Sequence, residues 1–174
     1  MQTTDVRPNI ISKQFANIPP IIRSNVDEAR VFAAIADLDN DKKTAEQFVS
    51  PMVPNMPLVQ QAVIAAYSSL LNDVFLLASA ILTKVLFTCT AWTLSSFAAQ
   101  HGYKGWGFYY NAFFPNTDYF PRASAYHSSE IPLVFGTYPL TNQYSVATGQ
   151  QKQLSRYMRK TWADFVKNPD QGPG

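Results

Sequence analysis

The chain has 174 residues, which suits one domain with a sizeable core. Its hydrophobic content of 47% excludes a disordered chain, and its net charge of +2, carried by scattered basic residues, does not predict a nucleic-acid partner. Cys89 is the single cysteine, so an intrachain disulfide is excluded within these residues. Two histidines without a paired ligand motif, and no Gly-rich phosphate loop, predict neither a metal nor a cofactor.

The first predicted strand covers residues 20–24, a β-branched run bounded by turn-forming residues. A polar surface segment over residues 1–17 precedes it. The strand ends in a loop that carries Asp27 and Glu28, and a short helix begins at this acidic end. Another short helix is predicted over residues 42–50, closed by Pro51.

Three further helices are predicted over residues 57–71, 74–87 and 90–100. The second is apolar on nearly all sides, which is typical of a buried helix. Lys84 and several Thr and Ser residues interrupt the apolar run that a membrane span needs, so buried core helices are expected and no transmembrane segment. His101-Gly102 ends the third helix, and His101 is interpreted as a helix cap.

A second strand is predicted over residues 105–114, which are dense in aromatic side chains. The clearest amphipathic helix follows over residues 151–166 and stops at Asn168-Pro169. Its apolar positions recur at helical spacing: Leu154, Tyr157, Met158, Thr161, Trp162, Phe165 and Val166. Two strands are fewer than the five or six of a typical sheet, so we expect an incomplete α/β sheet flanked by helices, with its other strands before residue 1.

The two predicted strands are followed by side chains that suit acid–base chemistry. A carboxylate, Glu28 or Asp27, follows the first strand, and His127 lies among small polar residues after the second. This is the order of the last two members of an α/β-hydrolase catalytic triad. The Ser of a G-x-S-x-G motif and a Gly-rich oxyanion loop are both absent from the 174 residues.

Five collinear blocks carry a family resemblance: residues 15–28, 86–89, 109–112, 127–136 and 162–169. On these blocks the chain resembles the C-terminal third of type-B carboxylesterases, the group that includes cholinesterases and fungal extracellular lipases. The closing residues 172–174 also resemble the fungal pattern. The resemblance implies that residues 1–174 are the C-terminal part of a single α/β-hydrolase domain, without its nucleophile half.

The resemblance implies roles for individual residues. Glu28 becomes the triad acid, His127 the triad base, and Glu130 a structural partner of the His127 loop. Cys89 matches a position that is disulfide-bonded in some members, and Ala29 stands where the family usually has Gly. The implied reaction is carboxylic-ester hydrolysis by acyl transfer. The isolated chain is expected to be inactive, because the serine and the oxyanion donors are missing. Secretion is expected from the family, although residues 1–7 lack a signal-peptide pattern.

Other interpretations remain open at this point. A truncated or degenerate hydrolase-like protein would act as a non-catalytic binding module, and the apolar stretch over residues 59–99 would suit a small membrane-associated protein. Cys89 and the three tryptophans are expected in the core. Four aromatic residues could pack or line a substrate pocket: Phe113, Phe114, Tyr119 and Phe120. An open sheet edge is expected to promote aggregation.

Overall fold

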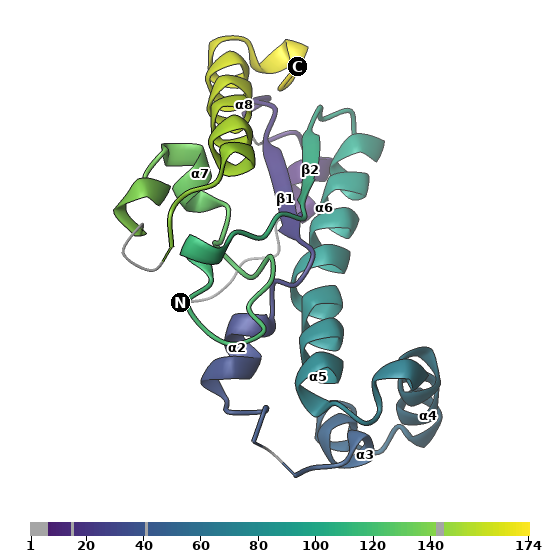
Figure 1. Cartoon of the computed structure of the whole chain (residues 1–174). Coiled ribbons are helices and arrows are strands. Elements are labelled where there is room, and N and C mark those ends of the chain that lie inside the picture. Colours follow the sequence, from purple (N-terminus) through teal and green to yellow (C-terminus); the bar gives the residue numbers. More distant parts are fainter. Residues whose placement is uncertain (1–6, 15, 41, 142–144) are drawn as a thin grey trace.

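The computed structural model describes residues 7–14, 16–40, 42–141 and 145–174. Its sheet has two parallel strands, β1 (Ile21–Asn25) and β2 (Trp106–Tyr110), in a register that pairs Ile21 with Trp106 and Asn25 with Tyr110. Parallel strands need a long crossover, and helices fill the chain between them (Figure 1). The predicted incomplete sheet flanked by helices is confirmed for the described residues.

The predicted helices form with shifted ends. Their bounds are α2 Arg30–Ile35, α3 Ala45–Val49, α4 Pro57–Ala66, α5 Val74–Leu82 and α6 Cys89–Gln100. A further helix, α1 Arg7–Ile11, forms within residues 1–17, where the sequence predicted only a polar surface segment. Helix α3 begins late because Thr44 and Gln47 form a reciprocal capping box. Helix α4 ends at Ala66, not at residue 71, and a 3₁₀ turn over Ser68–Leu70 follows. Helix α1 anchors the otherwise polar first segment through the buried Ile10; residues 1–6 lie outside the described residues.

Helices α5 and α6 form one continuous helix through a π-helical segment, Thr83–Thr88. Asp73 caps its start by accepting a hydrogen bond from the Leu76 N–H (3.0 Å). His101 follows its last residue, and Gly102 adopts a positive φ of 81°. This helix, Val74–Gln100, has the length and apolarity of a membrane-crossing helix, with 33% of its most apolar window buried. Core helices of soluble proteins have the same properties.

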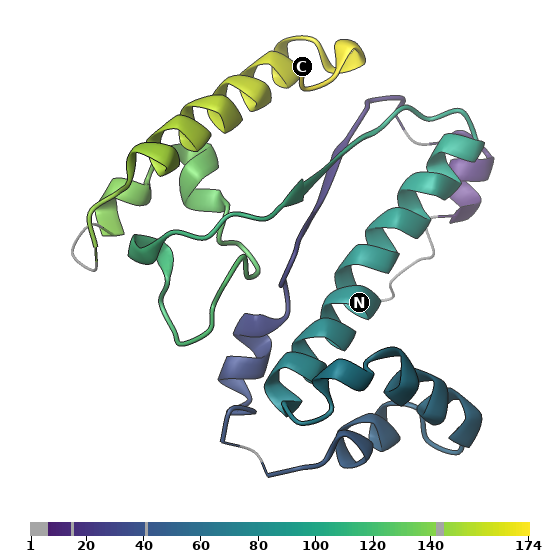
Figure 2. The same cartoon turned by 45° about the vertical axis from the view of Figure 1, so that its right-hand side comes forward.

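Helices lie on both sides of the strands (Figure 2). Helices α7 (Ile131–Phe135) and α8 (Gly149–Lys167) lie on one side, and the long α5–α6 helix lies on the other (Figure 2). The core beneath α7 and α8 is formed by Tyr110, Phe114, Ala125, Leu133 and Met158. Helix α8 confirms the predicted amphipathic helix and starts two residues earlier, because Thr148 accepts a hydrogen bond from the Gln151 N–H (3.1 Å).

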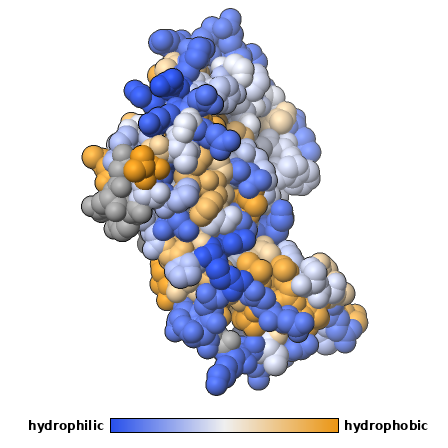
Figure 3. Space-filling view, viewed as in Figure 1, coloured by the Kyte–Doolittle hydropathy of each residue, from blue (hydrophilic) through white to orange (hydrophobic). Residues whose placement is uncertain are grey.

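A second apolar cluster joins the short helices to α5. Its buried members are Ala45, Val49, Leu77 and Ile81. Apolar side chains also reach the surface over this lower part of the molecule (Figure 3). The cluster fixes α3 and α4 against the start of the long helix, away from the strands.

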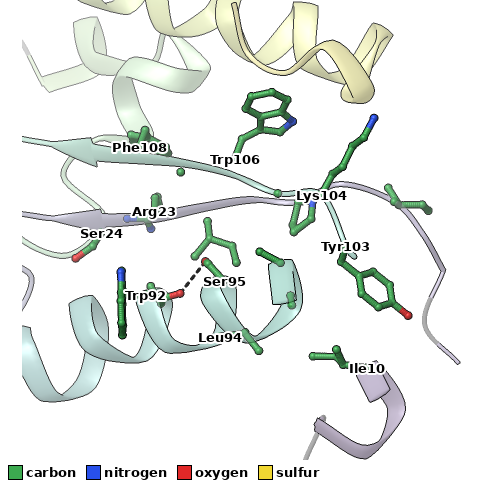
Figure 4. A pocket seen from close by; sticks show the side chains of 18 of the residues that line it. Ile10, Arg23, Ser24, Trp92, Leu94, Ser95, Tyr103, Lys104, Trp106 and Phe108 are labelled. Atoms are coloured by element: carbon green, nitrogen blue, oxygen red, sulfur yellow. Dashed lines mark hydrogen bonds between the residues drawn. The ribbon is translucent and has the colours of Figure 1, made fainter. Parts of the chain in front are cut away.

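An open apolar groove of about 700 Å³ lies between the strands and α6. Figure 4 shows Trp92 and Ser95 of α6 on the side that faces the strands. The prediction of a buried α6 is wrong, since none of its residues, all of them described, is fully buried. Trp92 is 71% exposed and Cys89 is also exposed, because no described segment covers this face. Trp106 and Trp162 are half-buried.

Strand β2 is shorter than predicted. It ends at Tyr110, whose carbonyl accepts a hydrogen bond from the Val26 N–H (2.9 Å), just beyond the end of β1. Phe114 instead precedes a 3₁₀ turn, Pro115–Thr117, whose Thr117 N–H donates back to the Phe114 carbonyl (3.0 Å). The aromatic residues after Tyr110 therefore serve the loop and the core, not the sheet.

Arg122 joins three segments below the strands. Its guanidinium pairs with Asp39 and Asp73 and lies 4.5 Å above the centre of the Phe75 ring. Burial alone would raise the pKa of Asp73, but the Leu76 N–H and the Arg122 guanidinium outweigh it and hold this pKa below its usual value. The charge of Asp73 therefore stabilises the fold.

We expect the Asp73→Asn variant to be less stable than the parent chain at pH 7, by about 1 kcal/mol. Asn retains the helix cap, so the loss reports the Arg122 pair. Because the pKa of Asp73 is lowered on folding, its contribution is present above the unfolded value of about 3.9 and is lost as the pH falls through the folded value. Urea unfolding at pH 7 and pH 3 checks this, and an equal difference at both would contradict it.

Candidate active site

The loops that leave the carboxyl ends of β1 and β2 meet at one edge of the sheet. Backbone hydrogen bonds join them: the Asp27 N–H donates to the Ala125 carbonyl (3.2 Å), and the His127 N–H donates to the Glu28 carbonyl (3.1 Å). This edge is where open α/β sheets bind their ligands. The strand order thus places both candidate residues at the same place, as the sequence predicted.

Glu28 and His127 form a direct hydrogen bond. His127 Nδ1 lies 2.6 Å from Glu28 Oε2. The Glu28 side chain is 2% exposed, whereas the His127 side chain is 38% exposed. A carboxylate only accepts hydrogen bonds, so Nδ1 carries the proton, and in the neutral imidazole Nε2 is then an acceptor. The arrangement orients an imidazole whose free nitrogen can take a proton from a neighbouring hydroxyl.

The other Glu28 oxygen is held from strand β1. Oε1 accepts the Asn25 backbone N–H (2.8 Å) and lies 3.7 Å from Arg23 Nη1. The buried Asn25 side chain donates to the Tyr126 carbonyl (2.7 Å) and to Glu130 Oε2 (2.6 Å). Glu130 therefore ties the His127 loop to β1, in the manner the resemblance implied.

Asp27 makes different contacts from its neighbour. It accepts the Ser124 hydroxyl (2.6 Å) and pairs with Arg30 (3.2 Å). Glu28, and not Asp27, is thus the acid that contacts the His127 ring. Ala29 is fully buried with a φ of −85°, so a side chain is accommodated where the family usually has Gly.

Two phenylalanines border the imidazole. The ring centres of Phe32 and Phe87 lie 5.7 and 5.1 Å from that of His127. Phe87 belongs to the π-helical segment, a feature that is frequent at functional sites. The same segment contacts the loop that carries Glu28, because Thr83 Oγ1 accepts a hydrogen bond from the Ala29 N–H (3.0 Å). Sequence reasoning missed both rings, although Phe87 lies in one of the family blocks.

The loop that carries His127 has an unusual backbone. Arg122, Ser124 and Ser128 adopt positive φ values of 63°, 56° and 73°. Such angles are uncommon for residues other than Gly and cluster at functional sites. The surrounding hydrogen bonds hold them, including the contact of Ser124 with Asp27.

Three of the four aromatic candidates pack locally, whereas Phe113 is 50% exposed. Phe114 is buried in the core, and the rings of Tyr119 and Phe120 pack against Tyr126. His101 Nδ1 lies 2.8 Å from the Phe97 carbonyl, as expected of a helix-end residue. Among the described residues, no group of three His, Cys, Asp or Glu side chains could hold a metal ion.

Parallel strands joined by a helical crossover, with a carboxylate and a histidine after their carboxyl ends, define part of an α/β-hydrolase fold. Comparison with known proteins agrees. The family model described as "Carboxylesterase family" matches residues 5–173, and the chain belongs to that family.

Individual relatives match this chain over only part of their own length. "Secreted lipase 5" of Gibberella zeae is 30% identical over 84 residues, which cover 48% of this chain and 15% of the lipase. A thermophilic pNB esterase superposes with a TM-score of 0.64 at 19% identity, over 97% of this chain and 33% of the esterase. Another pNB esterase structure gives a TM-score of 0.59 with the same coverage. The chain therefore spans about a third of these esterases.

Proposed function

We propose that this chain supplies the acid, Glu28, and the base, His127, of a serine carboxylesterase, and that residues 1–174 form the C-terminal part of its single catalytic domain. The observation that carries the proposal is the 2.6 Å contact between His127 Nδ1 and the buried Glu28 carboxylate. Membership of the carboxylesterase family supports a carboxylic ester as the substrate.

The chemistry follows from the orientation of the ring. His127 Nε2 takes the proton of a serine hydroxyl as the oxygen attacks the ester carbonyl, and then gives it to the leaving alcohol. Water enters by the same route and releases the acid. Glu28 keeps the proton on Nδ1 and stabilises the imidazolium that forms between the two transfers.

The serine and the oxyanion donors come from outside these residues in this proposal. The groove between the strands and α6 offers apolar surface for the rest of the domain, and within the described chain β1 pairs with β2 alone. An additional parallel strand beside β1 would complete the layers. We also propose an extracellular location, which rests on the similarity to a protein named as a secreted lipase.

Hydrolysis of p-nitrophenyl butyrate tests the division of labour. The purified 174-residue chain is expected to show no His127-dependent turnover, so the parent chain and His127→Ala should give the same rate. The polypeptide that joins the chain to its nucleophile-bearing segment is expected to turn over the ester. His127-dependent turnover by the chain alone would contradict the proposal, as would a His127-independent esterase in the longer polypeptide.

A further inference from the structure

Two buried carboxylates meet one guanidinium beneath the His127 ring. Glu28 and Glu130 are each 1% exposed. Arg23 Nη1 lies 2.8 Å from Glu130 Oε1 and 3.7 Å from Glu28 Oε1. In the described part of the chain, no other Lys or Arg forms an ion pair with either carboxylate.

Arg23 balances the charge of the two buried carboxylates. A buried carboxylate is costly unless it is paired, and two close carboxylates disfavour each other's ionised form. Asn25 donates to both, through its backbone N–H to Glu28 (2.8 Å) and its side chain to Glu130 (2.6 Å), but it carries no charge. The guanidinium is thus the positive charge that offsets both buried carboxylates.

The position of the charge also matters. Arg23 and the Asn25 N–H lie on the Oε1 side of Glu28, which leaves Oε2 to face His127 Nδ1. Arg23 does not contact the imidazole, and it acts on it through Glu28. We propose that Arg23 is a positioning residue that holds the Glu28 carboxylate directed at His127, an inference that rests on the proposed function.

Proton NMR of the full 174-residue chain tests this. An imidazole N–H donated to a carboxylate gives a resonance far downfield, which is expected in the parent chain and lost in His127→Ala. Arg23→Met is expected to lose the resonance, and Arg23→Lys to retain it. Arg30→Met is the matched control, because Arg30 pairs with Asp27 and not with Glu28; it is expected to retain the resonance.

A charge-balanced double variant separates this role from a loss of fold. In Arg23→Met with Glu130→Gln the second carboxylate is gone, so the resonance is expected to return. Two results would overturn the role of Arg23. One is that the resonance persists in Arg23→Met, and the other is that it does not return in the double variant, whether or not that variant is folded. Absence of the resonance from the parent chain would instead remove the Glu28–His127 pair and the proposed function with it.

Discussion

Replacement of Glu28 by Gln is expected to lower the kcat of the nucleophile-bearing polypeptide about 10⁴-fold. The shape of the side chain is kept, but a Gln amide can donate to Nδ1. The ring then carries its proton on Nε2, the nitrogen that must accept the serine proton. The buried contact between Glu28 Oε2 and His127 Nδ1 makes this change of tautomer the main effect.

Asp27→Asn provides the matched control, because it changes the neighbouring acid in the same way. Asp27 contacts Ser124 and Arg30 and lies outside the imidazole contact. We expect kcat to stay within about tenfold of the parent value, since no reacting group is touched. Equal losses in the two variants would contradict the assignment of Glu28 as the acid.

Replacement of Asn25 by Ala is expected to lower the free energy of unfolding by about 3–5 kcal/mol. The Asn25 side chain is fully buried and donates to the Tyr126 carbonyl and to the Glu130 carboxylate. Its removal leaves both acceptors without this donor, and one of them is charged. Urea unfolding monitored by circular dichroism measures the loss.

Asn72→Ala is the control for this substitution, since Asn72 lies on the surface just before the Asp73 cap. Its effect is expected to remain within about 0.5 kcal/mol, as for most surface changes. A comparable value for Asn25→Ala would show that the buried network does not stabilise the fold.

The positions of Glu28 and His127 could be predicted because the chain order constrains them. Each follows a strand, and parallel strands direct their carboxyl ends to the same edge. Helix α8 was predictable from its apolar spacing alone. The family blocks then separated Glu28 from Asp27, which strand order alone could not do.

The contacts that hold the Glu28–His127 pair from strand β1 could not be predicted. Arg23 and Asn25 alternate along a strand and would suit a solvated face as well as a buried one. Glu130, which both of them contact, lies more than a hundred residues away. The π-helical turn that brings Phe87 to the imidazole has no local sequence signal. The exposure of α6 depends on what covers the groove, which apolar composition does not report.

Labelling of the nucleophile-bearing polypeptide with a fluorophosphonate probe, which reacts with activated serines, is the most direct test of the acid–base pair. His127→Ala is expected to slow the labelling by about 10³-fold or more, because the serine loses its base. His101→Ala is expected to leave the rate unchanged, because that ring contacts Phe97 at a helix end. Labelling of His127→Ala at the parent rate would contradict the proposed role of this chain.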